Sequence, residues 1–232
     1  AAELLVGDGN PSGKTVDTFA KSLDDYPSTY NFHESRNYVD YTEDIYVGYR
    51  YFETIPGAAE KVVYPFGYGL SYTTFDVETV SAGVVNSNCT SETNKLYAKV
   101  RVTNTGKFSG KEVVQVYIAK PQGKLGKPAK ELAAFEKTRE LQPGESQLMI
   151  LTWEINDMAS YDDLGKVKKS AYVLEAGSYD IYVGTSVRDV TKADYSYILN
   201  HDVITEQLSA KLVPTSLPKR MLADGSYEAL PQ

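Results

Sequence analysis

A glycine-rich stretch near the start of the chain carries the most suggestive chemical motif. This stretch, Gly7–Thr15, reads GDGNPSGKT and ends like a phosphate-binding loop. Such a loop needs a glycine five positions before Gly13, and Asp8 occupies that position. The Asp8 carboxylate would repel a phosphate, and Pro11 removes a backbone N–H from the intended cradle. Because Val16–Ala20 also favours a strand over the required helix, we expect no nucleotide binding here.

Three carboxyl groups among tyrosines form a second candidate site, at Asp40, Glu43 and Asp44. Glycoside hydrolysis needs two carboxyl groups about 5–10 Å apart across the bond that is cleaved. The sequence does not fix this separation, and nothing in it marks one of the three groups as buried and protonated. We therefore interpret them as solvated loop acids or as partners of Arg50, and we predict no catalytic residue in this chain.

Metal and cofactor chemistry finds few suitable ligands. A single cysteine, Cys89, excludes an intramolecular disulfide and a multi-cysteine metal site, and only His33 and His201 could supply imidazole. We expect no metal and no cofactor. Asn88–Thr90 matches a glycosylation sequon, which we expect to be unused. The lone cysteine slightly favours a cytoplasmic over a secreted location, although the compartment stays unknown.

Charge and hydropathy argue against two classes of partner. A net charge of −7 would repel nucleic acid, and we expect the lysine-rich stretch Lys120–Lys130 to be a solvated loop. No apolar run approaches the roughly 18 residues of a membrane span. We expect neither a nucleic-acid nor a membrane partner.

The elements that would position any site are mainly strands. Apolar and polar residues alternate over Leu96–Thr103, as in a half-buried strand. Further strands are predicted from short apolar runs next to turn residues, at Glu112–Ile118, Gln147–Trp153 and Gly177–Gly184, and more weakly at Asp76–Val85 and Tyr195–Val203. We expect Leu96, Val100, Val102, Val114, Val116, Ile150, Ile181 and Val183 to be buried between two antiparallel sheets.

Residues 1–75 have little regular periodicity and are rich in tyrosine. Ten of the 19 tyrosines lie between Tyr26 and Tyr72. Their large rings with polar tips suit either a sugar site or loops wedged against a neighbouring core, and we favour the second interpretation.

Three motifs in residues 1–75 resemble the closing segment of the α/β-sandwich domain of glycoside hydrolase family 3 enzymes, which are β-glucosidases and their relatives. The motifs are Leu5–Lys14, Tyr41–Phe52 and Tyr64–Phe75, in the order and spacing typical of the family. The chain departs from the usual pattern at Thr15-Val16, where the family has Leu-Pro.

The later residues resemble the fibronectin type III-like domain that follows in many of these enzymes. The similarity is carried by Val102–Gly106, Gly110–Tyr117, Glu131–Glu136, Leu141–Glu145 and the strand that ends at Gly184. The expected fold is therefore mainly β, an antiparallel fibronectin type III-like sandwich over 76–207 preceded by the incomplete end of an α/β-sandwich domain over 1–75.

The resemblance implies a retaining β-glucosidase-type parent that acts on terminal non-reducing β-linked sugars. In that family the aspartate nucleophile lies in a TIM barrel, and the general-acid glutamate lies upstream of the segment matched by Leu5–Lys14. Neither position maps onto this chain, so we expect the chain alone to be inactive. Its expected partners are the barrel and the rest of the α/β-sandwich of the parent, whose substrate would be a β-glucosidic oligosaccharide or glycoside.

The tail, residues 208–232, is predicted to be a linker with one short helical turn. It resembles the connection in family members whose barrel follows the fibronectin-like domain. Since the chain also begins without methionine, we expect the parent to extend beyond both ends. Two alternatives stay open: a stand-alone carbohydrate-binding or adhesion sandwich, and a brace between domains with no ligand contact.

Overall fold

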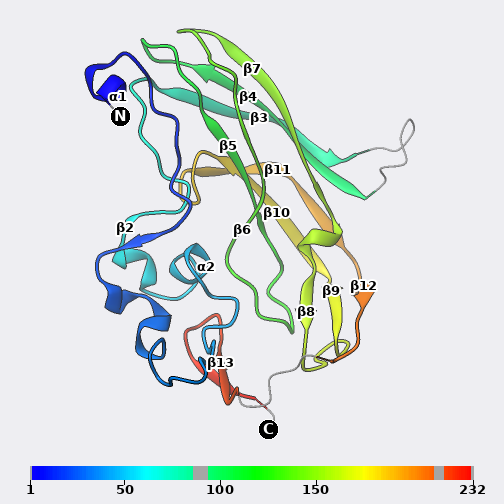
Figure 1. Cartoon of the computed structure of the whole chain (residues 1–232). Helices are drawn as coiled ribbons and strands as arrows, with labels where there is room; N and C mark the ends of the chain where they lie inside the picture. The colour runs from blue at the N-terminus through cyan, green and yellow to red at the C-terminus, as the bar shows by residue number, and fades with distance from the viewer. Residues whose placement is uncertain (1, 86–93, 212–216, 231–232) are drawn as a thin grey trace.

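Two facing antiparallel sheets form the centre of the molecule, as the computed structural model shows (Figure 1). The structure describes residues 2–85, 94–211 and 217–230, so the sequon at Asn88–Thr90 lies outside the described residues. One sheet has the order β3-β4-β7, formed by Phe75–Val84, Lys95–Asn104 and Ser146–Glu154. The other has the order β11-β10-β5-β6, formed by Val190–Leu199, Gly177–Gly184, Val113–Ala119 and Glu131–Lys137. The predicted antiparallel β-sandwich is confirmed.

The core between the sheets follows the predicted alternation. Along β4, the inward residues Leu96, Ala98, Val100 and Val102 are all fully buried. Val114 and Val116 of β5 and Ile181 and Val183 of β10 meet them from the opposite sheet, in one apolar cluster. Burial of this continuous cluster is the main force that holds the two sheets together.

The prediction that Ile150 is buried in the core is wrong. Ile150 is 59% exposed, whereas Met149, Leu151 and Trp153 of the same strand are buried in the core. Successive side chains of a strand point to opposite faces, so a shift of one residue reverses the assignment of the whole strand. Because β7 is apolar on both faces, with Leu148 and Ile150 outside, its sequence does not reveal which set is buried.

Several strands were not expected from the sequence. These include β6, and a three-stranded sheet of order β12-β9-β8 formed by Val203–Gln207, Ala171–Leu174 and Ser160–Asp162. The predicted strand Tyr195–Val203 is instead divided between β11 and β12. A short 3₁₀ helix, η4, at Asn156–Met158 leads from β7 into β8.

Residues 2–75 lie along one side of the sandwich as a series of short elements, coloured blue to cyan in Figure 1. In chain order these are α1 (Ala2–Val6), β1 (Phe19–Ala20), η1 (Leu23–Asp25), η2 (Pro27–Tyr30), α2 (Tyr49–Phe52), η3 (Ala58–Lys61) and β2 (Val62–Tyr64). Only the last two residues of the predicted strand Val16–Ala20 are a strand, which pairs with β2. The segment has little strand or helix pairing of its own, and most of its backbone hydrogen bonds close turns.

The contact between this segment and the sandwich centres on Gly67 and Gln115. The Gln115 side chain donates to the carbonyls of Gly67 and Thr185, at 3.3 and 2.7 Å, and the Tyr117 hydroxyl donates to it at 2.5 Å. Gly67 has a φ of 78°, and a Cβ there would lie 2.2 Å from Gln115. Only glycine fits this position. Because the segment covers the outer face of β5, five successive residues of that strand are buried.

Two further predictions from the sequence are wrong. The tail forms no helical turn among the described residues but a β-hairpin, β13 (Lys219–Met221) and β14 (Tyr227–Ala229), paired from Lys219–Ala229 to Met221–Tyr227. Nor is Lys120–Lys130 a simple solvated loop: the side chain of Lys127 is only 1% exposed and pairs with Glu175. A count of charges in the sequence cannot show that a lysine is buried against an acidic residue 48 positions away.

No helix in the described ranges is both long and apolar enough to cross a membrane.

Candidate functional site

A cavity of about 290 Å³ lies where three parts of the chain meet. One wall comes from Asp44–Tyr46, a second from the sandwich loops around Gly126 and Asp163, and a third from the C-terminal hairpin, Lys219–Ala229. The lining combines charged side chains with apolar ones such as Ile45, Leu125 and Met221. The site exists only because loops of the sandwich bring together segments more than a hundred residues apart.

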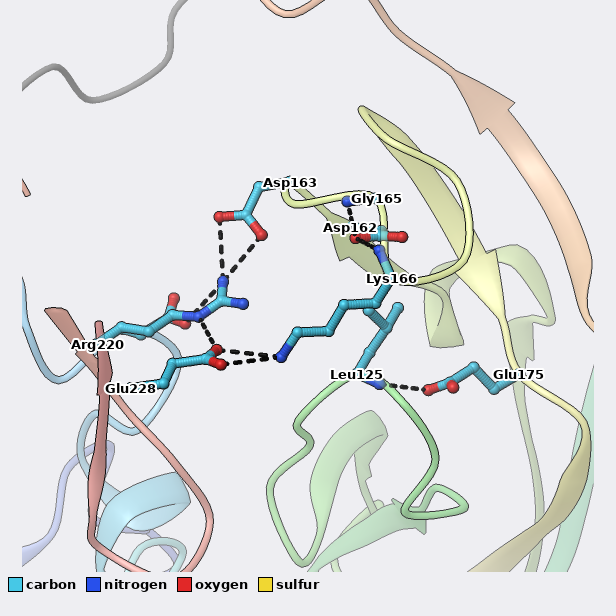
Figure 2. A network of polar contacts seen from close by, with 9 residues as sticks. Leu125, Asp162, Asp163, Gly165, Lys166, Glu175, Arg220 and Glu228 are labelled. Carbon is cyan, nitrogen blue, oxygen red and sulfur yellow. Dashed lines mark hydrogen bonds and ion pairs between the residues drawn. The ribbon is translucent and has the colours of Figure 1, made fainter. Parts of the chain in front are cut away.

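Arg220 is the centre of the charged network in this cavity (Figure 2). Its Nη1 donates to both carboxylate oxygens of Asp163, at 2.9 and 3.1 Å, and its Nε donates to Glu228 at 2.7 Å. Lys166 reaches the same Glu228 carboxylate, with Nζ at 3.1 and 3.2 Å from its two oxygens. Asp44 completes the group at 3.8 Å from Arg220 Nη1. The network ties the hairpin to the sandwich and to residues 2–75.

Asp162 positions the loop that supplies Asp163 and Lys166. Its carboxylate accepts four backbone N–H groups, from Gly165 and Lys166 on one oxygen and from Val167 and Lys168 on the other, at 2.7–3.0 Å. Burial opposes ionisation of this group, but the four hydrogen bonds outweigh it and lower the pKa of Asp162. The loop is thereby fixed by an ionised side chain at its base.

The environment shifts the acid–base properties of three groups in the cavity. Burial raises the pKa of Asp44, although Arg220 opposes the change. Burial also disfavours ionisation of Glu228, yet hydrogen bonds from Arg220 and Lys166 lower the pKa of that carboxyl. Burial raises the pKa of Tyr46 to about 12, so its hydroxyl stays protonated and can donate. The site thus offers ionised acceptors beside a neutral buried donor.

The structure places the three carboxyl groups named from the sequence in different environments. Asp44 lies in the cavity, whereas neither Asp40 nor Glu43 lines it. Glu43 is 5% exposed, and its Oε2 has no hydrogen-bond partner among the described residues. Arg50 pairs with Glu131 instead, at 3.3 Å. The interpretation of Glu43 as a solvated acid or as a partner of Arg50 is therefore wrong, because its loop folds inward.

The GDGNPSGKT stretch, Gly7–Thr15, makes structural contacts with two distant parts of the chain. Asn10 donates to the carbonyl of Ser109 and accepts from the backbone N–H of Tyr72, each at 2.9 Å. Lys14, the lysine that would hold a phosphate, forms an ion pair with Glu112 at 2.8 Å. The stretch thus joins two parts of the chain.

A second cavity, of about 220 Å³, adjoins the first across the ion pair of Lys120 and Glu131, since both residues line both cavities. Trp153 and Arg50 also line this second cavity. Residues such as Arg220, Asp163 and Trp153 were missed as site residues because nothing local in the sequence shows that they converge. Within residues 2–85, 94–211 and 217–230, no group of three or more His, Cys, Asp or Glu side chains is placed to hold a metal ion.

Comparison with known proteins identifies the domain first. The family profile of the fibronectin type III-like domain matches residues 112–187, which include β5, β6, β7 and β10. The chain is also 62% identical over 240 residues to β-glucosidase A of Butyrivibrio fibrisolvens, and 44% identical over 234 residues to a β-glucosidase of Ruminococcus albus. These alignments cover 100% and 99% of this chain, but only 29% and 23% of the two relatives.

Solved structures extend the same similarity to the fold. A β-glucosidase from Paenibacillus barengoltzii superposes with a TM-score of 0.86 at 48% identity, covering 99% of this chain and 25% of that one. β-Glucosidase 3B from Thermotoga neapolitana gives a TM-score of 0.74 at 40% identity over 88% of this chain and 26% of its own. The chain belongs to the family of the glycoside hydrolase family 3 β-glucosidases, and it spans less than a third of the length of these relatives.

Proposed function

We propose that this chain is the accessory, non-catalytic part of a retaining β-glucosidase-type hydrolase that removes terminal non-reducing β-linked sugars. On this proposal, residues 1–75 complete an α/β-sandwich domain, residues 76–207 are the fibronectin type III-like domain, and residues 208–232 connect onward. The nucleophile and the general acid then belong to the barrel and to the rest of the α/β-sandwich. Support comes from the similarity, which covers nearly all of this chain but under a third of each β-glucosidase compared above.

One structural observation carries the proposal: the sandwich holds residues 2–75 on one side, while large apolar side chains of the same segment remain in solvent. The held side includes Tyr49, whose hydroxyl accepts from the backbone N–H of Leu132 at 2.9 Å, and Glu53, which pairs with Arg188 at 2.8 Å. The exposed side chains, 70–89% accessible, are Leu5, Val6, Val16, Leu23, Tyr30, Tyr41 and Leu70. Apolar exposure on this scale marks a surface that another part of a protein covers.

The alternative of a stand-alone sugar-binding sandwich would need a flat row of exposed aromatic rings. The most suitable pair, Tyr161 and Tyr172, has ring planes inclined at 53°. These two rings therefore do not form a flat platform, and the accessory role is the better-supported function.

Hydrolysis of an aryl β-glucoside tests the proposal. The purified 232-residue chain is compared with the longer protein encoded around it, at equal concentration and with a buffer control. The longer protein should release the aryl group, and the chain should not exceed the buffer control. Turnover by the chain alone, in protein freed of contaminating hydrolase, would place catalytic groups here. An inactive longer protein would contradict the β-glucosidase assignment.

A further inference from the structure

We infer that the free edge of strand β7 is a docking surface for a second copy of this chain, which pairs with it antiparallel about a two-fold axis at Ile150. β7 (Ser146–Glu154) is an outer strand of the β3-β4-β7 sheet, and β4 is its only sheet neighbour in the described structure. The inference is independent of the accessory role proposed above and depends on the backbone register of this sheet.

The outer strands of the two main sheets differ in regularity. The pairings of β3, β11 and β6 with their neighbouring strands each contain a shift of register. The pairing of β7 with β4 runs unbroken from Ser146 to Glu154. Bulges, charged side chains and proline are features that prevent an edge strand from pairing with another chain. β7 has no shift in its pairing and no charged residue or proline from Ser146 to Trp153, so its edge lacks this protection.

Hydrogen bonds at the two ends of the β4-β7 ladder show which backbone groups of β7 point to its free edge. The Asn104 N–H donates to the Glu145 carbonyl at 2.9 Å, and the Ile155 N–H donates to the Asn94 carbonyl at 2.8 Å. Hydrogen-bonded and non-hydrogen-bonded pairs alternate along an antiparallel ladder, so the odd-numbered residues of β7 bond to β4.

The N–H and C=O groups of the even-numbered residues Leu148, Ile150 and Thr152 therefore point away from β4. No hydrogen bond within residues 2–85, 94–211 and 217–230 reaches these outward groups. An extended strand laid along this edge would pair with all of them.

The side chains next to this edge favour a strand added beside β7 over a protein stacked on the face of the sheet. Leu148 and Ile150 are 49% and 59% exposed on the outer face. Their neighbours on β4 are Arg101 and Lys99. A protein stacked on the face would bury these two cations, which is costly. A strand at the edge covers the apolar side chains and leaves the cations in solvent.

A second copy of β7 fits the edge because the strand is complementary to itself. In the antiparallel register centred on Ile150, this residue meets its own copy, and Leu148 meets Thr152 of the partner subunit. All of these residues have outward N–H and C=O groups, so the two strands can exchange hydrogen bonds. The apolar side chains of Leu148 and Ile150 from both copies then lie together on one face.

The same register brings opposite charges together at both ends of the paired strands. It sets Glu154 of one copy opposite Ser146 of the other, and the Ser146 carbonyl lies 3.5 Å from Arg139 Nη2. The side chains of Arg139 and Glu154 are 52% and 44% exposed, so each can reach the other across the interface. Complementary charges at the rim of an interface fix its register.

The pairing closes after two copies. It uses the β7 edge of both subunits, and the other outer strands of the main sheets contain shifts of register, so the described edges favour a dimer over a fibre. Residues 2–75 cover the other sheet, and Figure 1 shows the middle of β7 on the opposite side of the sandwich from them. One strand per copy is a small interface, so we expect a dissociation constant on the order of 100 µM.

Sedimentation equilibrium of the 232-residue chain tests the dimer, in a reducing buffer that keeps Cys89 from forming a disulfide between copies. The parent chain should pass from monomer to dimer between about 10 µM and about 1 mM. Ile150→Lys places two like charges at the axis and should weaken association about ten-fold or more. Leu70→Lys is the matched control, because Leu70 is 70% exposed but lies in residues 2–75, and it should associate like the parent chain.

Two further measurements test the geometry. The amides of Leu148, Ile150 and Thr152 should exchange more slowly as the protein concentration rises, whereas those of Met149 and Leu151, which face β4, should be slow throughout. Arg139→Glu and Glu154→Arg should each weaken association about three-fold or more, and the double variant should restore it to within about two-fold of the parent chain.

Four results would overturn the inference. One is a folded chain that stays monomeric at every concentration. Another is association that Leu70→Lys abolishes and Ile150→Lys leaves intact, since residues 2–75 would then hold the copies together. The third is a double charge variant that does not recover, which would exclude this register. The fourth is slow exchange of the Leu148 and Ile150 amides in the dilute longer protein, which would mean that another part of it covers β7. Loss of aryl-glucosidase activity would bear on the proposed function and not on this interface.

Discussion

Lys127 and Glu175 form an ion pair in the interior of the protein, where the Lys127 ammonium donates to Glu175 Oε2 and the two side chains are 1% and 4% exposed. The same carboxylate accepts the backbone N–H groups of Lys124 and Leu125, at 2.6 and 3.1 Å. The second of these bonds is visible in Figure 2. The pair therefore fixes the loop that forms one wall of the cavity, through a residue just before β10.

Removing one partner of this pair should be strongly destabilising. Lys127→Met leaves the Glu175 carboxylate buried without its counter-charge, and we expect a loss of about 3–5 kcal/mol in the free energy of unfolding. Urea unfolding followed by the fluorescence of Trp153 measures this loss. Lys124→Met is the matched control, since that side chain is exposed and should change stability by less than about 0.5 kcal/mol. Similar values for the two variants would contradict the burial of Lys127.

A second prediction concerns which face of strand β7 is buried in the core. Leu151→Ala should destabilise the protein by about 2–5 kcal/mol, because it removes apolar area from the core and leaves a cavity. Ile150→Ala, on the neighbouring residue, should cost less than about 1 kcal/mol, since that side chain is 59% exposed. Urea denaturation of both variants decides the register. A larger loss for Ile150→Ala would restore the assignment expected from the sequence.

The sequence predicts the sandwich well where a strand has one apolar and one polar face. In β4 the alternation is strict, so Leu96 and Val100 could be assigned to the core. In β7 both faces are apolar, so the periodicity does not reveal which face is buried. In β6 every residue is partly buried or exposed, so the periodicity does not predict this strand at all. Local patterns identify a strand only when burial differs between its two sides.

The candidate site could be predicted only in small part. Asp44 was named because carboxyl groups and tyrosines stand together in the sequence, and it does line the cavity. Arg220 and Asp163 stand 57 residues apart and meet through a hairpin that has no strong strand signal. Contacts between residues so far apart in the sequence leave no periodic pattern, so a single sequence does not show that Arg220 and Asp163 meet.

Acid should weaken the loop held by Asp162. The pKa of this carboxyl is lowered in the folded protein, against about 3.9 in an unfolded chain. Its stabilisation is therefore fully present above pH 4 and is lost as the pH falls through the folded pKa. We expect the stability difference between the parent chain and Asp162→Asn to shrink between pH 6 and pH 3, as measured by urea unfolding. Asp194→Asn, at an exposed position of β11, is the control and should show no such change.

Amide hydrogen exchange should divide the chain into two regions of different stability. Slow amides are expected in the central strands β4, β5 and β10, because each has a neighbour on both sides and borders the apolar core. Faster exchange is expected before Pro65, where short elements alternate with turns and where many large side chains are exposed. Gly67 and Tyr68 should be intermediate, since their contacts to Gln115 and Thr15 join the two regions. Hydrogen exchange measured on the 232-residue chain, resolved by peptide or by residue, makes the comparison.

Uniform protection across both regions would mean that residues 2–64 contain a stable core of their own. In that case the exposed apolar side chains would need no covering domain, and a self-sufficient binding module would become the better account of this chain.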